Sequence, residues 1–230
     1  MQRAMWATGV VAVAALVPVG AVTAAGSSYR YERSSTGANA IFTTCSGALA
    51  PGAHCEAWVV NADKSKGTDG KQSLVTVTIY DVEILEGGFS PVYRGSGRAE
   101  GTISVESKLG KASAQATVPV AVDCTEDGFC TEQSVVVSAQ WVAAAGPVKH
   151  SDTSEDDDGT CKTSRSYKSV NRGATATGTV DGTSYTATNL VQPPQIFSNQ
   201  ESYRATGCAE GPVFTPQVAT EATTPVFRIG

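Results

Sequence analysis

Strict alternation of apolar and polar residues over two consecutive segments is the feature that most limits how this chain can fold. Within residues 113–123, Ala or Val occupies every second position from Ala114 to Val122. Residues 134–143 alternate in the same way and place Trp141 on the apolar face. A period of two residues is typical of a β-strand with one buried face. Because Asp127-Gly128 between them is a hairpin-turn signal, we predict that the two segments form a β-hairpin.

Further short segments rich in Val, Ile, Thr, Tyr and Ser predict the rest of the sheet. They are residues 40–44, 56–61, 74–85, 101–107, 164–170, 174–180, 184–188 and 202–208. Asp181-Gly182 marks a second tight hairpin. Some ten strands with turn signals at short spacing predict an all-β fold, either an antiparallel β-sandwich or a barrel-like sheet. Val77 and Ile79 fall on the face opposite to Val82 and Ile84, so we expect a bulge or bend near Tyr80–Asp81.

Six cysteines point to a sheet held together by disulfides: Cys45, Cys55, Cys124, Cys130, Cys161 and Cys208. Cys124 and Cys130 flank the predicted hairpin turn and would staple its base. Proximity along the chain suggests the pairs 45–55, 124–130 and 161–208, although six cysteines allow fifteen pairings. A metal site is the competing interpretation. It is disfavoured because the chain has no C-x-x-C pair and its two histidines lie far apart.

Residues 1–25 have the pattern of a secretory signal peptide. Arg3 precedes an apolar run that ends at Pro18, and small residues follow it. The run is shorter than the roughly 20 residues that span a bilayer, and no longer apolar run follows, so no transmembrane segment is expected in the mature chain. We predict a secreted, extracellular protein, either released or kept at the cell surface. None of the five asparagines lies in an N-x-S/T acceptor, which favours a bacterial source.

The chain divides on composition into a few expected regions. A polar lead-in covers residues 26–37, and a single all-β domain covers residues 38–208. Within that domain, residues 150–159 hold five acidic residues and are expected to form an acidic loop. Residues 209–230 are rich in Pro, Thr and Ala and are expected to be a flexible tail. Alternatively, its Val213-Phe214 and Val226-Phe227 pairs would dock on a sheet edge.

The net charge of −5 argues against nucleic acid or anionic lipid as a partner, because both bind to positively charged protein surfaces. An extracellular protein or a glycan is the expected partner. The acidic loop suggests one cofactor, a calcium ion held by Asp152, Asp156 and Asp158. The match to a calcium loop is partial, since Ser154 stands at its first position and Arg165 at its last. The alternative is a solvated loop that keeps a sheet edge soluble.

No catalytic residue can be assigned from the sequence. His54 and His150 lie in no recognised motif, and Gly95-Ser96-Gly97 lacks the rest of a nucleophile elbow. Trp58 and Trp141 lie on predicted strands, where core packing competes with a role in stacking on a sugar. Phe129, inside the Cys124–Cys130 loop, is a third candidate binding residue.

These observations favour a non-catalytic binding or structural β-domain. One alternative is a secreted hydrolase of polysaccharide or peptide, which requires a deep pocket with two converging carboxylates, or a histidine beside a Ser or Thr. The other is a secreted enzyme inhibitor that uses the Cys124–Cys130 loop as a rigid contact, which requires an exposed Phe129.

Overall fold

The structure, a computed structural model, describes residues 28–45, 50–68, 70–125, 128–159, 161–187 and 192–208. The predicted signal peptide (residues 1–25) and the predicted tail (residues 209–230) lie outside the described residues. The described part contains ten antiparallel strands and no helix, which confirms the all-β prediction. The strands are β1 (Ser28–Cys45), β2 (His54–Gly67), β3 (Gly70–Leu85), β4 (Gly88–Glu100), β5 (Thr102–Val105), β6 (Lys111–Val122), β7 (Thr131–Asp157), β8 (Lys162–Val180), β9 (Thr183–Thr186) and β10 (Gln195–Thr206).

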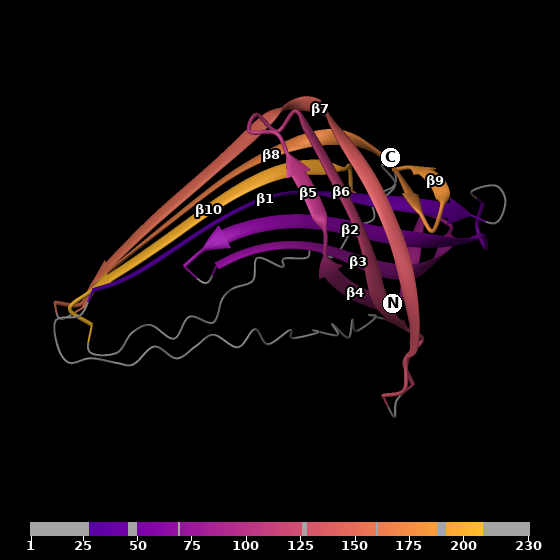
Figure 1. Ribbon diagram of the computed structural model, residues 1–230, viewed down its shortest axis with the longest axis horizontal. Coiled ribbons are helices and arrows are strands. Elements are labelled where there is room, and N and C mark those ends of the chain that lie inside the picture. The colour runs from indigo at the N-terminus through magenta and orange to yellow at the C-terminus, as the bar shows by residue number, and fades with distance from the viewer. Residues whose placement is uncertain are drawn as a thin grey trace.

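All ten strands belong to one sheet that closes on itself. The strand order is β10-β1-β2-β3-β4-β6-β7-β8-β9, and β10 also pairs with β8. The short β5 adds to β6, and β9 adds to β8 through the predicted Asp181-Gly182 hairpin. Of the two architectures that the sequence left open, the barrel-like sheet is therefore correct. Figure 1 shows the strands curving together over the region where the core lies.

The inner face of the sheet carries one continuous core, and the predicted alternation accounts for it. Alternate residues of β6 are buried, apart from the half-buried Ala116, and so are alternate residues of β7 from Val135 to Trp141, as expected for the hairpin. Trp141 is the largest of these side chains and is only 1 % exposed. Its indole Nε1–H donates a 2.8 Å hydrogen bond to the backbone carbonyl of Asn39 on β1. The bond joins β7 to β1 through the core, so the core is held by a directional contact as well as by burial.

The irregularity expected near Tyr80–Asp81 is present. Ile79 pairs with Gly95 and Tyr80 pairs with Tyr93, so Arg94 of β4 is the extra residue of a bulge. On β3, Ile79 lies in the inner core, whereas Val82 belongs to a second apolar cluster. The inserted residue lies on the neighbouring strand, so the alternation of β3 continues unbroken, and Val82 is buried by the second cluster on the face opposite to Ile79.

Strand β4 was not predicted, because this segment is rich in Gly and Ser and shows no alternation. Two of its glycines are explained by its close approach to β6. A Cβ at Gly95 would overlap the carbonyl oxygen of Ala121, and a Cβ at Gly97 would overlap that of Pro119. Only residues without a side chain allow the two backbones to approach this closely.

Several strands continue beyond the core to form a long arm, which Figure 1 shows narrowing to a tip. We define the arm as residues 28–37 of β1, 61–67 of β2, 70–73 of β3, 147–157 of β7, 162–172 of β8, and β10. Two predictions are corrected here. The expected lead-in is part of β1 from Ser28, and the expected acidic loop is β7 as far as Asp157. Both are strands because their backbone groups pair with β8, β10 and β2 despite polar side chains.

Residues 147–157 of β7 pair only with β8 among the described residues, so they form an edge of the arm. Every side chain along this edge is exposed.

The three disulfides suggested by proximity are confirmed. Cys45–Cys55 joins the ends of β1 and β2, and Cys124–Cys130 closes the hairpin between β6 and β7. Cys161–Cys208 lies at the tip of the arm, where it joins the β7–β8 turn to the end of β10.

Candidate functional site

The Cys124–Cys130 loop holds a large apolar side chain in solvent. Phe129 is 77 % exposed. It lies in the turn between β6 and β7, the two strands with the clearest apolar–polar alternation in the sequence. The amide of Thr125 donates to the carbonyl of Phe129 (2.8 Å), and the amide of Gly128 donates to the carbonyl of Thr125 (2.9 Å). Asp127, which formed part of the predicted turn signal, lies outside the described residues. Backbone hydrogen bonds and a disulfide thus fix the position of Phe129.

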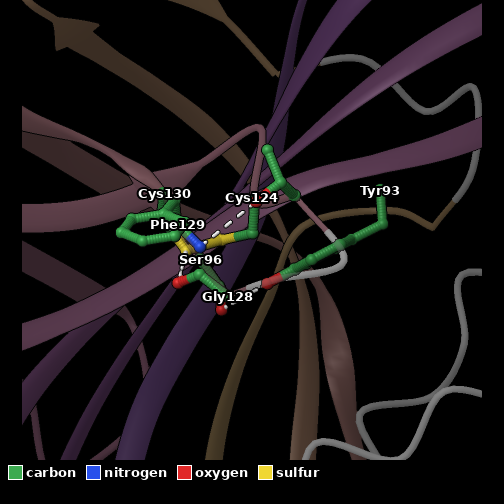
Figure 2. The surroundings of a disulfide bond; sticks show 7 residues. Tyr93, Ser96, Cys124, Gly128, Phe129 and Cys130 are labelled. Atoms are coloured by element: carbon green, nitrogen blue, oxygen red, sulfur yellow. Dashed lines mark hydrogen bonds between the residues drawn. A yellow bond between two sulfur atoms is a disulfide. The ribbon is translucent and has the colours of Figure 1, made fainter.

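Tyr93 of β4 adds a second aromatic ring near the loop. Figure 2 shows the rings of Phe129 and Tyr93 on either side of the Cys124–Cys130 bridge. The Tyr93 hydroxyl lies 2.9 Å from the Ser96 hydroxyl, and its ring packs edge-on against Tyr80 at a centroid distance of 6.0 Å. Tyr93 is half exposed. The loop and the adjoining part of β4 therefore present aromatic surface on a fixed framework.

Arg94, the bulged residue, anchors the loop to β4. Its Nε and Nη2 donate to the two carboxylate oxygens of Asp123 at 3.1 and 2.7 Å. The amide of Asp123 in turn donates to the carbonyl of Arg94 at 2.9 Å. The third guanidinium nitrogen, Nη1, lies 3.3 Å from Glu56 of β2. A two-pronged guanidinium–carboxylate contact fixes geometry as well as charge, so the base of the loop is held at the residue before Cys124.

An open pocket of about 410 Å³ lies beside this anchor, next to the Cys45–Cys55 disulfide. Its ionisable side chains are those of His54, Glu56, Asp81 and Arg94. Glu56 and Asp81 are directly paired on β2 and β3, an arrangement in which like charges repel. Arg94 offsets this repulsion at Glu56, and His54 Nδ1 lies 3.5 Å from Asp81. The side chains of His54 and Asp81 are 60 % and 48 % exposed, so the pocket does not exclude water.

The hydrogen bonds from Arg94 hold the pKa of Asp123 below its usual range, and the same contact raises the pKa of Arg94. An acid with a lowered folded-state pKa stabilises the fold above its unfolded value of about 3.9, and this stabilisation is lost as the pH falls through the folded value.

We therefore expect Arg94→Gln to lower the melting temperature at neutral pH and to make little difference once Asp123 is protonated. Melting curves of the wild type and the variant between pH 7 and pH 2 measure this. Arg98→Gln, at an exposed position of the same strand, is the control and should show no such convergence. A deficit in Arg94→Gln that persists unchanged at low pH would contradict the role given to the Asp123 contact.

The structure separates the other candidate residues. Trp58 and Trp141 are 5 % and 1 % exposed and belong to the core, so neither is placed to stack on a sugar. Asp152 and Asp156 are four residues apart on β7, about 13 Å at the usual strand rise. In the described part of the chain, no group of three or more His, Cys, Asp or Glu side chains is placed to hold a metal. His150 also lies on β7, where its ring meets Tyr167 at 6.4 Å.

Asp158 is used within the turn at the arm tip. Its carboxylate accepts a 2.6 Å hydrogen bond from the amide of Cys161, while Asp157 accepts one from Gly159 at 3.0 Å. These acids therefore order the turn that precedes the Cys161–Cys208 disulfide.

Sequence reasoning missed Arg94, Asp123 and Tyr93 as members of a site. The only signal that pointed toward them was the expected irregularity near Tyr80–Asp81, which did not identify the strand or the residue that would be inserted.

Comparison with protein-family models, curated proteins and solved structures finds no match for this chain. Within the described residues there is no helix with the length and hydrophobicity needed to cross a membrane.

Proposed function

We propose that the protein is a secreted, non-catalytic binding protein that engages a protein partner through the Cys124–Cys130 loop. The observation that carries the proposal is the exposure of Phe129 (77 %) on a loop held by a disulfide, backbone hydrogen bonds and the Arg94–Asp123 contact. The export pattern of residues 1–25 and the three disulfides support an oxidising, extracellular setting.

A fixed loop with one aromatic anchor suits protein recognition. Burying a phenylalanine side chain contributes about 1.5–3 kcal/mol, and aromatic side chains are common anchors in interfaces. Because the loop is already constrained, little conformational entropy is lost when a partner orders it. Tyr93 would extend the contact over β4.

The same observation favours a more specific candidate, inhibition of a secreted protease. A serine protease with an apolar specificity pocket accepts an aromatic side chain there, and a constrained loop would present Phe129 to such a pocket. Titration of a chymotrypsin-like and a trypsin-like enzyme with the protein would test this. Inhibition of the chymotrypsin-like enzyme alone, with loss of that inhibition in Phe129→Ala, would support a role as a protease inhibitor. If neither enzyme is inhibited, this role is ruled out.

The binding proposal itself is tested by placing a photo-crosslinking phenylalanine analogue at position 129, and at Val148 as the matched control. Val148 is 69 % exposed but lies on the arm, away from the loop. Irradiation in medium conditioned by the source organism should give a crosslinked partner from position 129 only.

Excess unlabelled wild-type protein should suppress the crosslink, whereas excess Phe129→Ala should not. Phe129→Ala should melt at the wild-type temperature, because the side chain is already exposed. Equal crosslinking from both positions, or equal competition by Phe129→Ala, would overturn the proposal.

A further inference from the structure

Six of the chain's eight lysines lie on one face of the arm, although the chain as a whole carries a net charge of −5. These are Lys64, Lys66, Lys71, Lys149, Lys162 and Lys168, and we call this surface the lysine face. The strand registers establish that it is continuous. Lys168 pairs with Gln200, Gln200 with Ser34, Ser34 with Lys66, and Lys66 with Lys71. Directly paired residues of antiparallel strands share a face, so one row crosses five strands.

The remaining lysines join this row through the period of two. Lys64 is two residues from Lys66, Lys162 is six residues from Lys168, and Lys149 is two residues from Ser151, the partner of Lys168. All six are exposed. The face continues from the core, because Ala62, two residues from Lys64, is buried with its partner Ala38. It is therefore the inner face of the curved sheet that Figure 1 shows.

The charges on this face are largely unbalanced. None of the six lysines forms an ion pair within the described residues. The same registers place three acids there: Glu32, which pairs with Arg30, Asp157, which stands directly opposite Lys162, and Glu155. Lys66 and Lys71 stand directly opposite each other, which destabilises a strand pair. A row of unpaired cations on an acidic protein is best explained by a ligand that supplies the missing anions.

We infer that the lysine face binds an extended acidic polysaccharide. Gln200 and Ser34 lie between Lys168 and Lys66 in the row, and their side chains can hydrogen-bond sugar hydroxyls. The lysines are point charges that suit sulfate or carboxylate groups along a chain.

Two other polyanions fit the face less well. Single-stranded nucleic acid is held by aromatic rings on which its bases stack, but Tyr31, Tyr167 and Tyr203 fall on the opposite face of the arm. An anionic membrane is a broad surface, whereas the lysine face is the inner side of a curved sheet. The face, distinct from the Phe129 loop, therefore carries a second binding function.

The test compares Lys66→Gln/Lys71→Gln with a control, Lys108→Gln/Lys111→Gln. Both variants lose two positive charges, but the control lysines lie outside the face. Calorimetric titrations of the full mature protein use heparin and polygalacturonate as sulfated and carboxylated probes, at 50 and 200 mM salt. A single-stranded oligonucleotide and phosphatidylglycerol vesicles serve as competing ligand classes.

We expect at least one polysaccharide to bind the wild type and the control equally. Lys66→Gln/Lys71→Gln should bind it more weakly, on the order of tenfold, and its dependence of log affinity on log salt should be shallower by about 2. Its melting temperature should equal or slightly exceed that of the wild type, because a repulsive pair is removed.

Equal loss in both variants would overturn the inference, because binding would then follow net charge alone. Absence of binding to both polysaccharides at 50 mM salt, or tighter binding to the oligonucleotide or the vesicles, would overturn it as well.

Discussion

Replacing Trp141 with phenylalanine should destabilise the protein by about 1–3 kcal/mol more than the same replacement at Trp58. Both indoles are buried in the same core cluster. The Nε1–H of Trp141 bonds the carbonyl of Asn39, whereas the buried Nε1 of Trp58 has no hydrogen-bond partner among the described residues. Phenylalanine at position 141 would remove this bond to the carbonyl of Asn39, and at position 58 it would remove a group whose burial already costs free energy.

Chemical denaturation of the two single variants measures this difference, with Trp141→Ala as a reference for loss of the whole side chain. That change should cost about 3–5 kcal/mol, since it also opens a large cavity. Similar losses for the two phenylalanine variants would show that packing alone, and not the bond to Asn39, stabilises the core at Trp141.

Removing the disulfide at the arm tip should destabilise the protein more than removing the one that closes the Phe129 loop. Cys161 and Cys208 are 47 residues apart, whereas Cys124 and Cys130 are 6 apart. Loop-closure entropy then assigns about 4 kcal/mol to the first bond and about 2.5 kcal/mol to the second. The tip disulfide also secures the last strand, β10, which pairs with both β1 and β8 and so closes the sheet.

The comparison uses Cys161→Ser/Cys208→Ser and Cys124→Ser/Cys130→Ser, so that both double variants keep the remaining bonds intact. Thermal melts should show the larger decrease for the first variant. An equal or reversed order would mean that β10 stays in place without its covalent tie and that the entropic argument does not apply to this fold.

Periodicity predicted the parts of the fold whose stability comes from burial. The hairpin of β6 and β7 was predicted because alternate residues such as Val118 and Val137 fill the core. The same signal failed for β4, where Gly95 and Gly97 are needed for close backbone approach and contribute no apolar side chain. It also failed on the arm, where most side chains are polar and strand pairing sets the conformation.

Of the candidate site, only the loop closed by the Cys124–Cys130 disulfide was predicted from the sequence. The cysteines located the loop and the exposed Phe129, but its anchor depends on a bulge that brings Arg94 to Asp123 across a sequence separation of 29 residues. Net charge was a poor guide for a related reason. The net charge of −5 does not show that six lysines lie on one face of the arm. Their common face follows from the register between paired strands, which the sequence of a single segment does not determine.

The outer edge of β7 affects how two copies of the protein meet in solution. Among the residues that the structure describes, no strand lies beyond this edge, and an open edge of this length can template the addition of another strand, which is the first step of fibre growth. Acidic residues occupy four of the last six positions of the strand, among them Asp152 and Glu155. Facing carboxylates would repel a second copy of the same edge, so we expect the acids at the end of β7 to disfavour pairing between two copies of the protein.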